Sequence, residues 1–129
     1  MELSESFNIK KGVRQGCPLS SILFNLFIND IFNNCNKYDI SVGDKRYCSG
    51  LFADDTVLCA PTRSQFKKLL KFSSKWARNN EMQFDINKCA SLVVRGEVSR
   101  FLYISNLTFY LSSQELPKTN CLSYLGVLF

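Results

Sequence analysis

The chain has 129 residues, of which 46% are hydrophobic and 13% aromatic, and its 16 basic and 11 acidic residues give a net charge of +5. This composition excludes a disordered chain, because its apolar content suffices for a core of one domain's size. The charge excess is compatible with a polyanionic partner but too small to establish one.

The cysteines and the apolar stretches exclude several further classes of protein. The chain has six cysteines without a C-x-x-C pair and no histidine, which argues against the usual zinc patterns and favours free thiols in a reducing compartment. No secretory signal opens the sequence, and the most apolar stretch, residues 19–32, is interrupted by polar residues. We therefore expect an intracellular protein, in the nucleus or cytoplasm, without a membrane span.

The first part of the chain is predicted to contain a strand, a turn and a helix. Residues 7–13 alternate in polarity and predict a strand that leads into a turn bracketed by Gly12 and Gly16. Pro18 then begins a helix, with Ser20 as its candidate cap and apolar residues at helical spacing up to residue 31. The apolar face is broad, which predicts that this helix is buried on more than one side.

The middle of the chain predicts a short hairpin and a second helix. A Gly-Asp turn within residues 40–47 indicates a hairpin or edge strand. Residues 63–79 predict an amphipathic helix with an apolar inner stripe and a basic outer face. The inner stripe consists of Phe66, Leu69, Leu70, Ser73, Trp76 and Ala77, and the outer face of Lys67, Lys68, Lys71, Lys75 and Arg78. The basic face is typical of a solvated surface, with nucleic-acid contact as the alternative.

The last part of the chain has the alternation that is typical of strands. Residues 84–88 and 90–95 predict two strands with a corner at Cys89, and alternation resumes from residue 100, with Asn106 at a turn. Residues 121–129 follow Pro117 and complete the pattern. The predicted architecture is α+β, with two helices packed on one face of an antiparallel sheet and a C-terminal β-hairpin segment.

Two adjacent aspartates, Asp54 and Asp55, lie between the apolar runs 48–53 and 56–60. The runs predict paired strands, so both carboxylates fall at a two-residue turn. Such turns prefer Asn-Gly or Asp-Gly, and neighbouring carboxylates repel each other, so a bound cation would explain the pair. Mg²⁺ fits, because it takes oxygen ligands from one or two carboxylates. A solvated turn is the alternative.

Four segments, taken in order, resemble reverse transcriptases of non-LTR retrotransposons, with group II intron enzymes as more distant relatives. The first runs Gly12-Val13-Arg14-Gln15-Gly16-Cys17-Pro18-Leu19-Ser20 and continues through Asn29; the second is Phe52-Ala53-Asp54-Asp55; the third includes Trp76, Asn80, Met82, Phe84 and Lys88-Cys89; the last is Tyr124-Leu125-Gly126 with Phe129. Four ordered segments are a far more specific pattern than an isolated Asp-Asp pair.

The resemblance implies a partial polymerase palm that acts as an RNA-directed DNA polymerase, with two Mg²⁺ ions, an RNA template, a DNA primer and deoxynucleoside triphosphates. It makes Asp54 a direct metal ligand and Asp55 a nearby ligand or electrostatic supporter, both catalytic. The remaining implied site residues are Gly12, Arg14, Gln15, Gly16 and Lys88 for nucleotide or template-primer contact, and Tyr124, Leu125 and Gly126 for the hairpin that supports the primer.

The sequence also departs from the family's pattern. Ser21 stands where these enzymes commonly have proline, and Phe52 where many reverse transcriptases have tyrosine. The family places a further metal-binding aspartate on a palm strand upstream of the first segment. We expect that strand, the fingers and the thumb to be absent. Residues 1–129 would then form a single partial domain that is inactive alone. The alternatives are an inactive retroelement relic or a non-catalytic nucleic-acid-binding module that uses Lys10, Lys11, Arg14 and the basic helix face.

Overall fold

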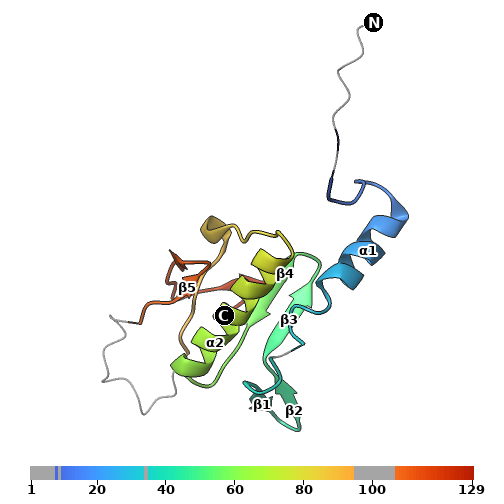
Figure 1. The fold of residues 1–129 in the computed structure, drawn as a ribbon. Helices are drawn as coiled ribbons and strands as arrows, with labels where there is room; N and C mark the ends of the chain where they lie inside the picture. The colour runs from blue at the N-terminus through green and yellow to red at the C-terminus, as the bar shows by residue number, and fades with distance from the viewer. Residues whose placement is uncertain (1–7, 9, 34, 95–106) are drawn as a thin grey trace, which may run out of the picture. The chain divides into compact units, whose positions relative to one another are not determined.

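The computed structural model describes residues 8, 10–33, 35–94 and 107–129. The chain forms two compact units, Met1–Asp30 and Ile31–Phe129. Its described part is a small α+β fold with two α-helices and short antiparallel strands, which confirms the predicted class at that level (Figure 1). No helix in this part of the chain is long and apolar enough to cross a membrane.

The first unit contains helix α1, Pro18–Ile28. Proline at the first helical position is favourable, because its missing N–H would have no partner there. Cys17 is the N-cap and makes no side-chain cap bond. Ser20 therefore lies inside the helix and is not the cap that we predicted; its hydroxyl donates to the Arg14 carbonyl at 2.6 Å.

Within the first unit by itself, helix α1 buries only Ile28, and no other described helix or strand of this unit covers its broad apolar face, so the predicted burial stays a prediction. The strand expected over residues 7–13 was wrong, because it is not seen at positions 8 and 10–13, where Gly12 has a φ of 114°, incompatible with a continuous strand. Residues 7 and 9 lie outside the described residues.

The second unit contains four β-hairpins. Among the described residues the strands pair two by two along the chain, giving four two-stranded antiparallel sheets rather than the single sheet that we expected. The strands are two to four residues long. The pairs are β1 Ile40–Val42 with β2 Lys45–Tyr47, β3 Ser49–Phe52 with β4 Asp55–Leu58, β5 Tyr110–Leu111 with β6 Gln114–Glu115, and β7 Ser123–Tyr124 with β8 Val127–Leu128.

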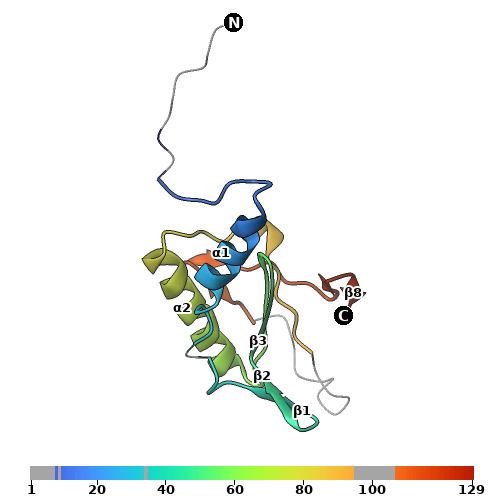
Figure 2. The same cartoon turned by 90° about the vertical axis from the view of Figure 1, so that its right-hand side faces the viewer.

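Helix α2, Arg63–Asn79, has the bounds that its periodicity predicts. Its buried residues are Leu69, Leu70, Ser73 and Ala77, all from the predicted inner stripe. The helix contacts β5, and Figure 2 shows it beside the layer that contains β3. The predicted hairpin of residues 40–47 is also confirmed as β1 and β2.

Two apolar clusters form the core of the second unit. One contains Leu70, Phe109, Leu111 and Leu116, and the other contains Cys35, Cys48 and Leu69. Leu58, at the end of β4, packs against both clusters. This residue therefore anchors the β3–β4 hairpin in the core at the end away from its turn.

The strands predicted over residues 84–88 and 90–95 are not formed in the described part of the chain. A 3₁₀ turn, η1 Ile86–Lys88, replaces the first, because the Asp85 carboxylate accepts a bond from the Asn87 N–H at 3.1 Å and caps the turn. In the second predicted strand, residues 90–95, the structure has a single parallel bridge between Ser91 and Lys118. Residue 95 and the expected alternation and turn over residues 100–106 lie outside the described residues.

The alternation that follows is confirmed. Phe109 and Leu111 are buried and Tyr110 between them is exposed. The C-terminal segment folds back on itself as the hairpin of β7 and β8, and Leu122 and Phe129 extend the pairing with backbone bonds of 3.0 and 2.8 Å. A C-terminal β-hairpin is therefore present.

Candidate active site

The β3–β4 hairpin carries the adjacent aspartates at its tip. Phe52 pairs with Asp55, so the two turn residues are Ala53 and Asp54, and Asp55 is the first residue of β4. The expected hairpin is confirmed, but the turn lies one residue earlier than predicted. Ala53 has a φ of 52°, in the left-handed region that this turn demands and that glycine tolerates better.

Both carboxylates are exposed, and neither makes a side-chain hydrogen bond or ion pair with any residue that the structure describes. Alternate residues of a strand point to opposite faces, so Asp55 shares a face with Val57 and lies opposite the core-facing Leu58. The hairpin is thus fixed at its base and presents acidic oxygens to solvent at its tip.

The structure brings the hairpin together with Tyr124 of the C-terminal hairpin. A Cβ atom placed on Gly50 would lie 3.6 Å from the Tyr124 hydroxyl and 3.0 Å from Cγ1 of Val57, which pairs with Gly50 across the strands. Tyr124 therefore lies over the face of the hairpin that also carries Asp55. Sequence reasoning missed Gly50, and its signal was a glycine inside an apolar strand, which often marks a close approach.

The remaining residues of the predicted C-terminal site form the turn between β7 and β8. Leu125 and Gly126 have φ values of 50° and 78°. Two successive positive φ values are typical of the tight hairpin turn that glycine and asparagine favour. Leu125 is exposed, and no atom lies within 4 Å of a Cβ placed on Gly126, so the tip of this second hairpin is also open.

The glycine-bracketed segment belongs to the first unit, so its predicted role beside the aspartates stays a prediction. Gly12 and Gly16 have φ values of 114° and 78°, and a Cβ on either would meet no atom within 4 Å. Arg14 and Gln15 between them are exposed. Two glycines in conformations that other residues avoid leave open space in which another chain can approach the backbone.

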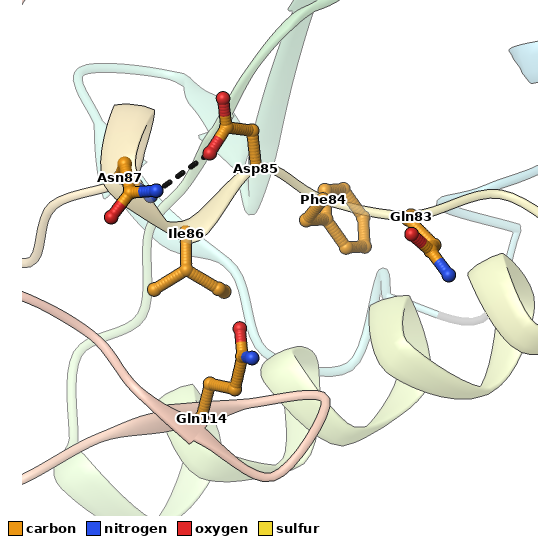
Figure 3. Close-up of a pocket in the computed structure, with 6 residues that line it drawn as sticks. All are labelled: Gln83, Phe84, Asp85, Ile86, Asn87 and Gln114. Atoms are coloured by element: carbon orange, nitrogen blue, oxygen red, sulfur yellow. Dashed lines mark hydrogen bonds between the residues drawn. The ribbon is translucent and has the colours of Figure 1, made fainter.

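Lys88 ends the η1 turn and its side chain is exposed. The residues before it belong to the core around Leu58, because Phe84 and Ile86 pack against the same cluster. They also border an open hollow of about 630 Å³, shown in Figure 3, where Ile86 lies across from Gln114. Its lining consists of Gln83, Phe84, Asp85, Ile86, Asn87 and Gln114. No contact with Asp54 or Asp55 connects this hollow to the hairpin tip.

The two adjacent carboxylates suit a hard cation. Across the described residues there is no group of three or more histidine, cysteine, aspartate or glutamate side chains that could hold a metal ion. Mg²⁺ does not require such a cage, because it is commonly held by one or two carboxylates together with water and substrate phosphates. Asp54 and Asp55 therefore fit part of a magnesium site that phosphates would complete.

The six cysteines are all free thiols, as expected. Burial raises the pKa of Cys35 and of Cys59, with a smaller contribution from the nearby Cys48. Burial also raises the pKa of Cys89, with Asp85 as the second cause. Three of the thiols are thus kept in the neutral form, which suits small apolar side chains better than nucleophiles or metal ligands.

Comparison with known proteins assigns the chain to a family. Residues 1–129 match the family of the reverse transcriptase (RNA-dependent DNA polymerase). The chain belongs to this family, and the hairpin with its acidic tip lies within the matched region. This confirms the resemblance that the four ordered segments indicated.

Its relatives are proteins of R2 retrotransposable elements. The chain is 31% identical over 131 residues to the retrovirus-related Pol polyprotein from type-2 retrotransposable element R2DM of Drosophila melanogaster, covering 98% of this chain and 12% of that protein. It is 28% identical to the Pol polyprotein from type-1 retrotransposable element R2 of Popillia japonica, covering 94% of this chain and 21% of that protein. No solved structure matches the chain.

These matches identify a reverse transcriptase fragment of the non-LTR retrotransposon type. The chain spans between about an eighth and a fifth of the length of the relatives just named. The family generally uses divalent metal ions, a nucleic-acid template and nucleotide substrates.

Proposed function

We propose that the β3–β4 hairpin contributes the metal-binding carboxylates Asp54 and Asp55 to an active site that copies RNA into DNA. The observation that supports this most directly is an acidic pair with no partner among the described residues, held at the exposed tip of a hairpin that Leu58 anchors in the core. A rigid base and an open tip allow the carboxylates to meet a substrate without rearrangement.

The reaction of this family joins a nucleotide to a primer. The 3′ oxygen of the primer forms a bond to the α-phosphorus of the nucleotide, the bond from that phosphorus to pyrophosphate breaks, and the hydroxyl proton passes to solvent water. Bound Mg²⁺ supplies the charge that lowers the pKa of the primer hydroxyl and stabilises the leaving pyrophosphate. Asp54 serves as a direct ligand, and Asp55 as a second ligand or a source of negative charge that favours the cation.

The other proposed contacts lie with the template, the primer and the nucleotide. Tyr124, with Leu125 and Gly126 at the turn beyond it, supports the primer end; the position of the Tyr124 hydroxyl over the Asp55 face of the hairpin favours this role. The segment of Gly12, Arg14, Gln15 and Gly16, together with Lys88, contacts nucleotide or template-primer. The open space at both glycines and the exposed side chains between them are compatible with such contacts.

We further propose that this chain alone does not polymerise DNA and represents part of the palm. The described residues contain no third acidic, cysteine or histidine side chain grouped with the aspartate pair, so a site for two metal ions would need a protein ligand from elsewhere. In the intact enzyme, a further aspartate, the fingers and the thumb would come from other segments.

Magnesium-dependent nucleotide binding tests the proposed role of the hairpin. A fluorescent deoxynucleoside triphosphate should bind the 129-residue chain more tightly when Mg²⁺ is present. Asp54→Asn should lower the affinity measured with Mg²⁺ at least tenfold. Asp44, an exposed aspartate at the turn of the β1–β2 hairpin, provides the matched control, and Asp44→Asn should leave binding unchanged. The proposal would be contradicted if both variants lost the same nucleotide affinity, or if the affinity of the unchanged chain were the same with and without Mg²⁺.

Primer extension completes this test. With an RNA template, a DNA primer and Mg²⁺ or Mn²⁺, the chain by itself should incorporate no nucleotide. Incorporation that disappears on Asp54→Ala would show instead that the chain holds a complete active site.

A further inference from the structure

The positive charge of this protein is concentrated on helix α2. Its 17 residues include six basic side chains and no acidic one. The remaining 112 residues carry ten basic and eleven acidic side chains, so α2 alone accounts for more than the whole net charge of +5. The nearest acidic residues in the sequence, Asp55 and Glu81, both lie outside the helix.

Four of these cations form a single row along the helix. Lys67, Lys71, Lys75 and Arg78 are all exposed and fall within about 80° of the helix circumference at 100° per residue. The row rises by about 6 Å between successive lysines and extends over about 16 Å. Lys68 lies beside the row, where its Nζ is 5.7 Å from the centre of the Tyr38 ring.

The other face of α2 is already used by the core. Leu69 and Leu70 are 0% and 4% exposed, and Ala77 is 2% exposed. A basic amphipathic helix can also bind a membrane surface or a helix-binding groove, but both modes require a free apolar face. Since that face is buried, only the charge of α2 is available to a partner, which favours a polyanion.

We propose that the row of Lys67, Lys71, Lys75 and Arg78 binds the phosphate backbone of single-stranded RNA. Membership of an RNA-dependent polymerase family favours RNA over other polyanions, because RNA is the template that such a polymerase copies. The row lies on the side of α2 opposite the residues packed toward the β3–β4 hairpin, so it is separate from the proposed metal site. Contacts to phosphate alone predict binding without sequence preference.

Fluorescence anisotropy with a labelled strand of twenty uridines tests this surface in the 129-residue chain, between 50 and 200 mM KCl. Replacing all four residues of the row by glutamine should weaken binding at least tenfold at 100 mM. It should also reduce the slope of log affinity against log salt by about 3, because each phosphate contact to a single strand contributes about 0.7. The matched control replaces three lysines and one arginine that are exposed elsewhere, Lys37, Lys45, Arg46 and Lys118, and should weaken binding less than threefold.

Each of several outcomes would overturn the proposal. Equal weakening by the two quadruple variants would assign the binding to net charge. A tenfold preference for DNA of the same length, or equal competition by polyglutamate, would assign the surface to a different partner.

If circular dichroism shows that the fourfold variant is unfolded, Lys71→Gln with Lys75→Gln should still reduce the slope of log affinity against log salt by about 1.4. Asp54→Asn with Asp55→Asn should leave RNA binding unchanged, which separates this surface from the proposed polymerase function.

Discussion

Gly50 is the point at which β3, β4 and Tyr124 come together in the candidate site. It lies in β3 opposite Val57, whose Cγ1 is 3.0 Å from where a Cβ on Gly50 would be, and the Tyr124 hydroxyl lies 3.6 Å from the same point. A contact of 3.0 Å is tighter than almost all those that side-chain carbons make, so a side chain at Gly50 would force Val57 to shift. Tyr124, at 3.6 Å, would be in ordinary van der Waals contact with the same atom.

Gly50→Ala should destabilise the protein by about 1–2 kcal/mol, because the added methyl group overpacks a filled site. Urea unfolding measures this directly. The double variant Gly50→Ala with Val57→Ala provides the control, since the smaller partner removes the short contact and should recover part of the loss relative to the sum of the single variants. Strict additivity of the two changes would contradict the proposed contact.

Among the elements, α2 has the clearest local origin in the sequence. Thr62 is its N-cap: the hydroxyl accepts a bond from the Gln65 N–H at 3.3 Å and contacts Gln65 Oε1 at 2.7 Å. Thr-x-x-Gln is a capping-box spacing, which satisfies N–H groups that the first helical turn leaves without partners. The cap and the helical spacing of the apolar residues agree on where the helix starts.

Thr62→Ala should lower the free energy of unfolding by about 1 kcal/mol through the loss of this cap. Thermal or urea unfolding followed by circular dichroism at 222 nm is the measurement. Ser64, exposed in the first turn of the same helix, is the control, and Ser64→Ala should change stability by less than about 0.5 kcal/mol. An equal effect at both positions would mean that the Thr62 side chain does not cap the helix.

The success of prediction differed between elements for physical reasons. The bounds of α2 and the hairpins of β1–β2 and β3–β4 followed from periodicity and turn residues, which act locally. The strands expected near Phe84 and Ser91 were wrong, because alternation there competes with the Asp85 cap of a 3₁₀ turn. Burial of α1 stays a prediction, since a broad apolar stripe does not specify which element covers it.

The candidate site was predictable to a similar extent. The acidic pair at a hairpin tip followed from Asp54 and Asp55 themselves, although the turn is shifted by one residue. The contact between Tyr124 and Gly50 joins residues more than seventy positions apart, and no local pattern predicts such a pair. Recognition of the family came from the order of several segments, which no single motif provides.

For the molecule as a whole, three thiols with raised pKa values, one buried and two half-buried, make stability depend on pH. The pKa values of Cys35, Cys59 and Cys89 are raised above the ordinary value of 9.0, chiefly by burial. Above pH 9 the unfolded chain therefore releases these protons before the folded protein does, and the folded state holds more protons. Stability must then fall as pH rises through this window.

Urea unfolding in a reducing buffer at pH 8, 9 and 10 should show this decline. Replacing Cys35, Cys59 and Cys89 by alanine should flatten the dependence, whatever the change in stability at pH 8. The exposed Cys17 and Cys121 provide the control, because their replacement should leave the slope unchanged. A slope that persists after removal of Cys35, Cys59 and Cys89 would assign the pH dependence to other groups.

NMR spectroscopy with Mn²⁺ shows whether the β3–β4 hairpin binds a metal ion at its tip. Paramagnetic broadening in the 129-residue chain should appear first at the amides of residues 53–56. Asp54→Asn with Asp55→Asn should abolish that broadening, whereas Asp44→Asn at the turn of the neighbouring hairpin should leave it intact. Broadening that is spread evenly over the acidic residues, or that survives in the double variant, would contradict a metal site at this tip.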